Sequence, residues 1–362
     1  MKWIDLLHRW AGGIIGLVLA LLGLSGAILV FKHQWLGWLP GARDAQRQDV
    51  PALAAQVEAA MASPAGQPQS ILFAHADFGL AKLSLGGEAG AYADQSGRLV
   101  TSWTSKWDRI ELWLFDFHHH LFMGDAGEVL AGIAGLIGLA FVVTGAILWW
   151  RLRGTFKLRL WPRRMSRSAI VTHHRDIGIV FAPMLFLTMA TGMLMVLEPI
   201  RNALFAPGQP AGALSAPYKP PAVKGGPLAR DLDWSAMLET ARARYPEAEL
   251  RILSFPRKPG DLIQLRMRQP AEWLPNGRTV MWFRPESGAM VATRDALAMP
   301  AGTRAFNLTY QIHAAKVGGM VWKLIVAATG LSLAMLGSLA VWTFWFRRPA
   351  RRAVRATAAA AA

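Results

Sequence analysis

The residues of this sequence that are best suited to chemistry are histidines, which gather at the ends of long apolar runs. His8 and His174 are each followed at once by an arginine and, four residues after the histidine, by a glycine. His118 and His313 each stand six residues before a glycine that opens another apolar run. Neutral imidazole is the commonest protein ligand for metal ions. The spacing therefore predicts two pairs of metal-binding histidines, with one member of each pair in each half of the chain.

The apolar runs themselves indicate a membrane protein. Hydrophobic residues make up 53% of the 362 residues, too large a share for an ordinary soluble protein. A helix needs roughly 20 apolar residues to cross a bilayer. Four runs are long enough, at residues 10–31, 129–150, 178–197 and 317–346. The first exceeds the ~7–15 apolar residues of a signal peptide, so we expect an uncleaved anchor and a mainly α-helical protein with four transmembrane helices.

The positive charge of the chain, +16 in total, lies beside the predicted spans. One basic loop contains no acidic residue, and a second basic segment follows the fourth span: Arg151, Arg153, Lys157, Arg159, Arg163, Arg164 and Arg167, then Arg347, Arg348, Arg351, Arg352 and Arg355. Short basic segments beside spans mark the cytoplasmic side. Both termini are thus predicted to be cytoplasmic and the two long loops external. This topology explains the charge without nucleic-acid binding.

The two external segments, residues 34–117 and 198–312, resemble each other. Each has a helix-like stretch, then stretches with the alternating pattern of strands, then a Ser-Gly turn. The matching stretches are 52–62 and 234–245, 71–74 and 250–255, 81–85 and 262–268, and Ser96-Gly97 and Ser287-Gly288. We expect two small α+β modules in a chain of two tandem repeats, related by an axis along the membrane normal. The alternative is chance recurrence of small residues, which are common where membrane helices pack.

The predicted organisation follows from these patterns. The first span (1–33) leads into the first module (34–117), the second span (118–151) and the basic loop (152–172). The third span (173–197), the second module (198–312) and the fourth span (313–346) repeat this order, and a disordered tail (347–362) follows.

A two-fold axis would make equivalent histidines face each other. His8 would then face His174 near the inner surface, and His118 would face His313 near the outer surface. Two imidazoles that face each other across an apolar helix bundle suit the axial positions of a haem iron. Cysteine is absent, which excludes thioether attachment. The sequence therefore predicts two non-covalent haem b groups, each with two histidine ligands.

Other residues near these histidines fit the same interpretation. Arg9 and Arg175 could pair with haem propionates at the inner site, and Lys316 could do so at the outer one. Small-residue pairs in the spans allow close approach of helices or of a flat ring: Ser25-Gly26, Thr144-Gly145 and Thr191-Gly192.

The choice within the histidine clusters stays open. His173 is an alternative to His174, and His119 or His120 to His118. His33 could be an extra or substitute outer ligand, and we expect His75 to be a surface residue.

Several stretches resemble the PepSY-associated transmembrane helix family. They are "LHRWAGG", "HHHLFMGDAGEVLAGIAGLIGLAFVVTGAILWW", "HHRDIGIV" and the two external modules, which look like PepSY domains. Within that family, the chain is most similar to bacterial inner-membrane ferric-siderophore reductases, which carry b-type haems on histidines. The resemblance implies an inner-membrane location, reduction of a ferric siderophore on the periplasmic side, and ligation at His8, His118, His174 and His313. Some relatives carry a fused flavin reductase domain.

The functional hypothesis is an oxidoreductase that conducts single electrons. The electron would enter at His8 and His174, pass to His118 and His313, and reduce Fe(III) in an external chelate. No P-loop, dinucleotide-binding or H-E-x-x-H motif is present, so the electron donor must be separate, either a quinol or a cytoplasmic reductase. Two alternatives stay open, a PepSY-type envelope regulator that inhibits a protease, and a transporter of metal or haem.

Overall fold

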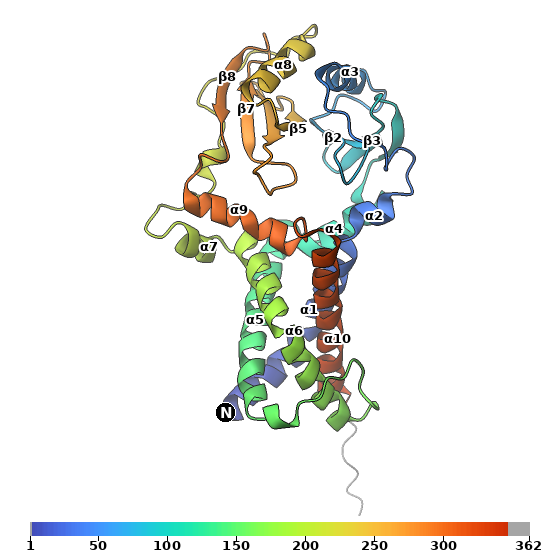
Figure 1. Cartoon of the computed structure of the whole chain (residues 1–362), viewed down its shortest axis with the longest axis vertical. Helices are drawn as coiled ribbons and strands as arrows, with labels where there is room; N and C mark the ends of the chain where they lie inside the picture. Colours follow the sequence, from blue (N-terminus) through green and yellow to red (C-terminus); the bar gives the residue numbers. More distant parts are fainter. Residues whose placement is uncertain (1, 347–362) are drawn as a thin grey trace, which may run out of the picture. The chain divides into compact units, whose positions relative to one another are not determined.

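The computed structural model describes residues 2–346, so the predicted tail at 347–362 lies outside the described residues. These residues fall into two compact units (Figure 1). Of the described residues, the helical unit contains 2–27, 133–190 and 327–346, and the sheet unit consists of Ile28–Gly132 and Thr191–Val326.

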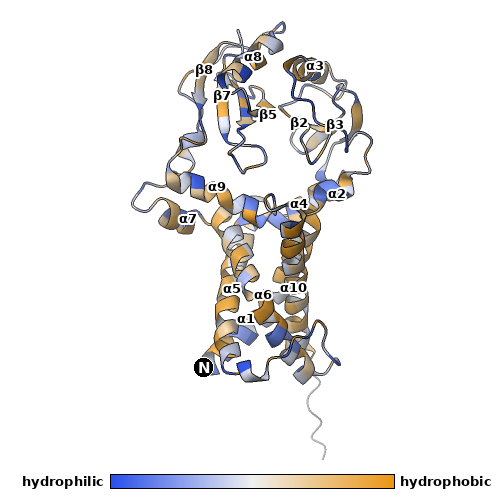
Figure 2. Ribbon diagram, viewed as in Figure 1, coloured by the Kyte–Doolittle hydropathy of each residue, from blue (hydrophilic) through white to orange (hydrophobic). Residues whose placement is uncertain are grey.

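Four helices are long and apolar enough to cross a membrane, as predicted. They are α1 (Lys2–Leu29), α5 (Gly124–Trp150), α6 (Arg167–Val196) and α10 (Gly319–Trp345). Figure 2 shows the hydrophobic colouring concentrated along α5, α6 and α10. Their apolar side chains are largely exposed within the protein, which is the expected state of a helix that faces lipid.

The predicted starts of the second and fourth spans were wrong. We expected helices from His118 and His313, but α5 begins at Gly124 and α10 at Gly319. The backbone turns to positive φ between these points, at Leu121, Phe122 and Gly124, and at Ala315, Gly318 and Gly319. A left-handed residue cannot continue an α-helix. His118 and His313 therefore end separate helices, α4 (Ile110–His120) and α9 (Ala301–His313).

The other two spans also differ from prediction at their ends. Helix α1 stops at Leu29, and a short helix α2 (Lys32–Leu36) follows, so the first span does not reach residue 33. Helix α6 begins at Arg167, inside the predicted basic loop, because no residue before His173 breaks the helix there.

Within the helical unit, α1 and α10 approach each other closely at glycines. A β-carbon on Gly23 would lie 2.6 Å from the carbonyl oxygen of Gly330, and one on Gly16 would lie 3.1 Å from that of Gly337. Backbone contact of this kind needs small residues at both helices. The contact fixes how α1 presents its N-terminal residues beside α10.

The sheet unit contains one antiparallel sheet with the order β4-β3-β2-β1-β5-β6-β7-β8. Its strands are β1 (Ser70–Leu72), β2 (Ala81–Gly86), β3 (Ala89–Ala93), β4 (Leu99–Trp103), β5 (Glu249–Ser254), β6 (Ile263–Arg268), β7 (Thr279–Phe283) and β8 (Met290–Arg294). We expected two separate modules. Instead, β1 pairs with β5, with Ile71 opposite Leu253, so the two sets of four strands share a continuous sheet. The pairing satisfies strand edges that separate modules would leave open.

One face of the sheet packs against α3 (Val50–Met61) and α8 (Trp234–Arg244). Fully buried apolar residues from both helices and from alternate strand positions form this core, among them Val57, Leu238, Leu83, Leu253 and Leu265. An aspartate accepts a backbone hydrogen bond at the start of each helix: Asp49 from Ala52 at 3.0 Å and Asp233 from Ala236 at 2.8 Å.

The opposite face of the sheet carries the neighbours of these core residues, because successive side chains in a strand alternate between faces. It includes Lys82, opposite Leu72, and Arg266, opposite Ile252. This face is therefore partly cationic.

The two predicted Ser-Gly turns are present, with φ of 87° at Gly97 and 68° at Gly288. Both connect adjacent strands, β3 to β4 and β7 to β8. The helix α7 (Glu198–Phe205) and the helix α9 that carries His313 were not predicted, because their short amphipathic patterns lie in loop-like sequence.

Candidate cofactor and metal sites

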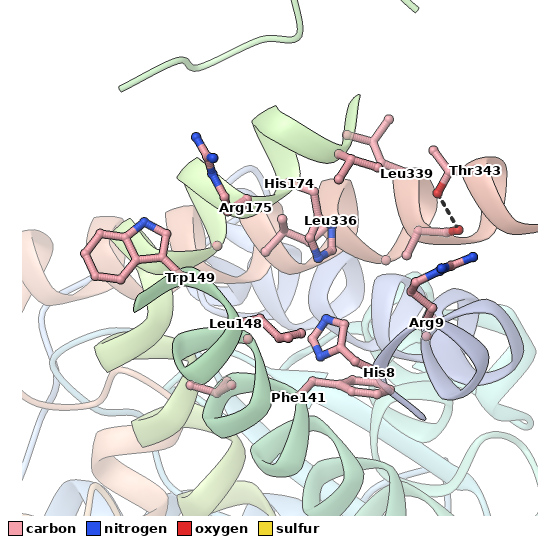
Figure 3. A pocket seen from close by; sticks show the side chains of 18 of the residues that line it. His8, Arg9, Phe141, Leu148, Trp149, His174, Arg175, Leu336, Leu339 and Thr343 are labelled. Carbon is pink, nitrogen blue, oxygen red and sulfur yellow. Dashed lines mark hydrogen bonds between the residues drawn. The ribbon is translucent and has the colours of Figure 1, made fainter. Parts of the chain in front are cut away.

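His8 and His174 come together within the helical unit. His8 lies on α1 and His174 on α6, and their ring centres are 6.2 Å apart with the planes nearly perpendicular, at 87°. The two rings point toward one another in Figure 3, and Phe141 of α5 lies against the His8 ring at 5.3 Å. We call these residues the first histidine pair.

Thr144 determines which nitrogen of His8 carries the proton. Its Oγ1 lies 2.8 Å from Nδ1 of His8 and donates its own proton to the carbonyl oxygen of Ala140 at 2.6 Å. A hydroxyl has a single proton, so when Oγ1 donates to Ala140 it accepts a hydrogen bond from Nδ1–H of His8. The neutral ring then carries a lone pair at Nε2, the nitrogen that is available to a metal. The ring of His174 is hydrogen-bonded to the backbone of Leu336.

The first histidine pair lines a cavity of about 440 Å³ between the helices of this unit (Figure 3). Most of its wall is apolar, with residues from α1, α5, α6 and α10 such as Leu148, Leu336 and Leu339. Arg9 and Arg175, the predicted propionate partners, also lie in its wall. A mostly apolar cavity with a few convergent polar groups is typical of a cofactor site.

The two arginines have partners of their own. Arg9 forms an exposed ion pair with Asp5 at 3.4 Å. Arg175 forms an ion pair with Asp176 at 2.6 Å and donates to Thr155, and its guanidinium points away from the two imidazoles in Figure 3. The pairing of either arginine with a propionate stays a prediction.

Asp176 was not assigned a role from the sequence. Its carboxylate is completely buried and also pairs with Arg159 at 2.5 Å, so it fixes the basic loop to α6. The sequence does contain a signal for this role, because Asp176 is the first acidic residue after the basic loop.

His173 has a different environment from His174. It is fully buried, and its Nε2 lies 3.0 Å from the carbonyl oxygen of Leu160 in the basic loop. His174, but not His173, belongs to the cavity wall. The geometry therefore favours His174 as the ligand and gives His173 a role in loop attachment.

His118 and His313 come together within the sheet unit, and we call them the second histidine pair. Their ring centres are 6.1 Å apart at an angle of 43°. The neighbouring histidines have other contacts: His119 stacks on Phe115 at 4.6 Å, and His120 lies 3.3 Å from a carboxylate oxygen of Asp116. This geometry favours His118 over the other two.

A threonine-glycine pair on a long helix contacts one histidine at each site. Thr144 bonds Nδ1 of His8, and a β-carbon on the next residue, Gly145, would lie 3.5 Å from Cε1 of that ring. In the sheet unit, Thr191 Oγ1 lies 3.3 Å from Nδ1 of His313, and a β-carbon on Gly192 would lie 2.9 Å from Cε1. Both pairs were noted in the sequence only as small residues.

His33 and His75 lie together in the sheet unit. Their ring centres are 5.0 Å apart, and His33 also stacks on Phe78 at 5.5 Å. Asp77 completes a group whose ligand atoms all lie within 4.8 Å of one another. We expected His75 to be a plain surface residue, which was wrong: it is half-buried because the turn that carries it packs on the ring of His33.

Both of these imidazoles are kept neutral. Burial and, to a smaller extent, the charges of Arg251, Lys316 and Lys32 together lower the pKa of His75 to about 3. The pKa of His33 is also lowered, first by burial and then by Lys316 and Lys32. Loss of solvent and nearby positive charge both disfavour the imidazolium form.

The ring separation of the two histidine pairs is that of two imidazoles bound to one metal ion. A metal ion bonded to two imidazole nitrogens at about 2.0 Å each puts the ring centres roughly 6 Å apart, since each nitrogen lies about 1 Å from its ring centre. The observed separations are 6.2 and 6.1 Å. The hydrogen bond at Nδ1 of His8 and the apolar cavity beside it agree with such ligation.

The sequence profile of a known family, described as the PepSY-associated TM region, matches residues 6–348. The chain belongs to the PepSY-associated TM region family. Together with the four apolar helices, this membership indicates a multi-pass membrane protein embedded in a lipid bilayer. The uncharacterized protein PA4219 of Pseudomonas aeruginosa is 29% identical over 235 residues, which are 61% of this chain and 58% of that protein. The match thus spans little more than half of the relative.

Proposed function

We propose that this PepSY-associated protein is a dihaem oxidoreductase of the bacterial inner membrane that reduces a ferric siderophore on the periplasmic side. The observation that carries the proposal is the presence of two histidine pairs with the ring separation of a bis-imidazole metal centre. His8 and His174 would hold one haem b, and His118 and His313 the other. Bound haem supplies a one-electron couple between Fe(III) and Fe(II).

The protein's own residues make such centres specific. Thr144 holds His8 in the tautomer that leaves Nε2 free, and Thr191 lies at the corresponding nitrogen of His313. Gly145 and Gly192 leave the room that each ring occupies. The mostly apolar wall of the cavity surrounds the first histidine pair, which favours ligation by neutral imidazole.

The orientation belongs to the same proposal. Basic residues between α5 and α6 would place that loop in the cytoplasm and the sheet in the periplasm. The recurrence of the order helix, four strands, short helix and spanning helix supports descent from a tandem duplication. Repeat-equivalent histidines would then explain why each pair takes one member from each half.

The substrate reaction is a single-electron reduction. Fe(III) in the chelate gains one electron and becomes Fe(II), which hard oxygen donors bind more weakly, so the chelator releases the metal intact. The electron comes from a separate donor, either a quinol or a cytoplasmic reductase. No proton has to be moved at the iron itself.

An absorbance spectrum of the purified protein tests the proposal. We expect a reduced-minus-oxidised spectrum of low-spin haem b and a haem-to-protein ratio near two. His8→Ala should lose one haem and His118→Ala the other, whereas His119→Ala, the matched control, should retain both. Full ferric-chelate reduction by haem-free protein would overturn the proposal. Unchanged cellular function after replacement of all four histidines would favour the regulator, and substrate accumulation in liposomes without a donor would favour the transporter.

A further inference from the structure

His33, His75 and Asp77 form a cluster of metal-ligating side chains outside the two histidine pairs. Each side chain offers one ligand atom, and these atoms all lie within 4.8 Å of one another. The ring centres of the two histidines are 5.0 Å apart, and their planes are inclined at 62°. Three ligand atoms that each lie about 2.0–2.2 Å from one ion are roughly 3–4 Å from one another. The cluster therefore needs only a small adjustment to hold a metal ion.

A tight turn and an apolar contact position the three ligands. The N–H of His75 donates to the carbonyl oxygen of Phe78 at 2.9 Å, and the N–H of Phe78 donates to that of His75 at 2.8 Å. The ring of Phe78 is buried and belongs to an apolar cluster with Leu36, which lies on α2 and is also buried. Because α2 carries His33, this cluster joins the two segments that supply the histidines.

The ligands differ in their exposure. His33 and His75 are half-buried, whereas Asp77 is exposed, so a hydrated ion has access to the cluster from solvent. Both imidazoles are neutral, which is the form that binds a metal ion. Ligation would end the long hydrogen bond, 3.3 Å, that Nδ1 of His75 accepts from the amide of Asp77, because a metal-bound imidazole has no second lone pair.

The charges around the cluster limit how tightly it can bind a cation. The ionised groups that act on the two rings are cations, namely Lys32, Lys316, Lys323, Arg251 and Arg268. Asp77, Glu111 and Glu249 are the carboxylates that offset part of this charge. The remaining positive charge repels a dication, so the site should bind it less tightly than a structural zinc site does. Such a site is suited to holding an ion briefly and releasing it.

An apolar contact joins this region to the second histidine pair. Val30 and Phe31, which precede His33, pack together with Ala315, which follows His313 by two residues. The segment that carries the first ligand of the cluster therefore lies against the segment that follows one histidine of the second pair.

The ligand types of the cluster differ from those of a ferric chelate. Two histidines and one carboxylate are the ligands of many non-haem Fe(II) sites, whereas hard oxygen donors hold Fe(III) far better than Fe(II). A change from Fe(III) to Fe(II) thus shifts the preference of the ion from the chelator toward imidazole.

We propose that His33, His75 and Asp77 form a receiving site for the Fe(II) that reduction of the chelate releases. The inference rests on the proposed function, since that reaction supplies the Fe(II). At this site, bonds from iron to the chelator oxygens are replaced by two bonds to imidazole nitrogens and one to a carboxylate oxygen. No electron is exchanged in this step, and no proton leaves the neutral rings.

Anoxic equilibrium dialysis of the purified full-length protein against ferrous sulfate tests this site separately from electron transfer. Bound non-haem iron is measured with a colorimetric ferrous chelator, and we expect one Fe(II) per chain. His33→Ala, His75→Ala and Asp77→Asn should each raise its Kd at least about tenfold, since even the loss of a supporting hydrogen bond costs about 10–100-fold at metal sites. His119→Ala and Asp231→Asn, at a stacked histidine and an exposed aspartate of the same unit, should leave Kd unchanged.

Each outcome decides the matter. Wild-type protein that binds no Fe(II), or ligand variants that bind it as the wild type does, would overturn the site. Asp77→Asn keeps the test valid even if a histidine variant failed to fold, because that side chain is exposed. Binding of Zn²⁺ but not of Fe(II) would make the cluster a structural zinc site. Loss of one haem in His33→Ala, with Fe(II) binding intact, would assign His33 to the second haem instead. Failure of the haem spectrum would end the proposed function but would leave Fe(II) binding measurable.

Discussion

The hydroxyl oxygen of Thr144 lies 2.8 Å from Nδ1 of His8 and 2.6 Å from the carbonyl oxygen of Ala140, so a hydroxyl that donates to Ala140 accepts from Nδ1–H. The tautomer of His8 is therefore set by a residue on another helix. At metal sites, such supporting hydrogen bonds determine both the orientation of the ligand and its affinity.

Thr144→Val should accordingly weaken the first haem site. Valine has nearly the shape of threonine but accepts no hydrogen bond, so we expect a roughly 10–100-fold loss of haem affinity at this site. Haem titration of the apo-protein measures it, and Thr144→Ser should restore most of the affinity. Thr172→Val is the matched control, since that hydroxyl bonds only within α6, to Ser168. Equal affinities in the threonine and valine proteins would show that the hydrogen bond has no influence on ligation.

Glycine-to-alanine changes should separate the two sites. A β-carbon at position 192 would stand 2.9 Å from Cε1 of His313, closer than side chains tolerate, whereas one at position 145 would stand 3.5 Å from Cε1 of His8. We expect Gly192→Ala to displace His313 and to lose one haem, and Gly145→Ala to retain both. The haem-to-protein ratio is the measurement. The reverse result would contradict the geometry of the two threonine-glycine pairs.

His173 and His174 should differ although they are adjacent. His174→Ala is expected to remove the haem of the first pair, because that ring faces the cavity. His173→Ala should retain the haem and release the basic loop, whose Leu160 carbonyl its ring contacts. Limited trypsin digestion of the basic loop, together with the absorbance spectrum, distinguishes the two effects. A loss of haem in both variants would reject the distinction.

The buried carboxylate of Asp176 should matter for stability. Asp176→Asn leaves the guanidinium groups of Arg159 and Arg175 without their countercharge, which we expect to cost about 3 kcal/mol. Asp5→Asn breaks an exposed pair with Arg9 and should cost less than about 1 kcal/mol. The shift in thermal unfolding midpoint in detergent measures both. Similar shifts for the two variants would argue against a buried ion-pair network at the loop.

Acid should destabilise the sheet unit through His75. The pKa of this imidazole is about 3 in the folded protein and 6.5 ordinarily, so the unfolded chain binds the extra proton between these values. Stability should thus be unaffected above pH 6.5 and fall as the pH drops toward 3, by up to about 1 kcal/mol per pH unit. Unfolding midpoints between pH 7 and 4 measure the slope, which His75→Gln should reduce. An equally steep slope in that variant would place the acid sensitivity elsewhere.

The sequence alone was sufficient to predict the four apolar spans and the pairing of His8 with His174 and of His118 with His313. Runs of about 20 apolar residues identify spans by composition, and the repeated spacing around His8 and His174 made a symmetric arrangement the simplest reading. Strands such as β2 and β6 followed from their period of two. These features depend on local pattern or on repetition, which one sequence contains.

The contacts that were missed are tertiary. His33 and His75 are 42 positions apart in the sequence, and nothing in this spacing indicates that their rings are in contact. The same holds for the pairing of β1 with β5, since a strand's composition does not specify its partner. Arg175 was assigned to a propionate because it directly follows His174, and nothing in the sequence showed its ion pair with Asp176.

The joint between β1 and β5 has a consequence for biogenesis. Ile71 can pair with Leu253 only after most of the polypeptide has been made. Until then, the edge of β1 has unpaired backbone N–H and C=O groups. Such groups can pair with other nascent chains, which is a recognised cause of aggregation. Assembly of the sheet should therefore be governed by synthesis of the late half of the chain, and a holding chaperone would protect the edge of β1 until β5 is available.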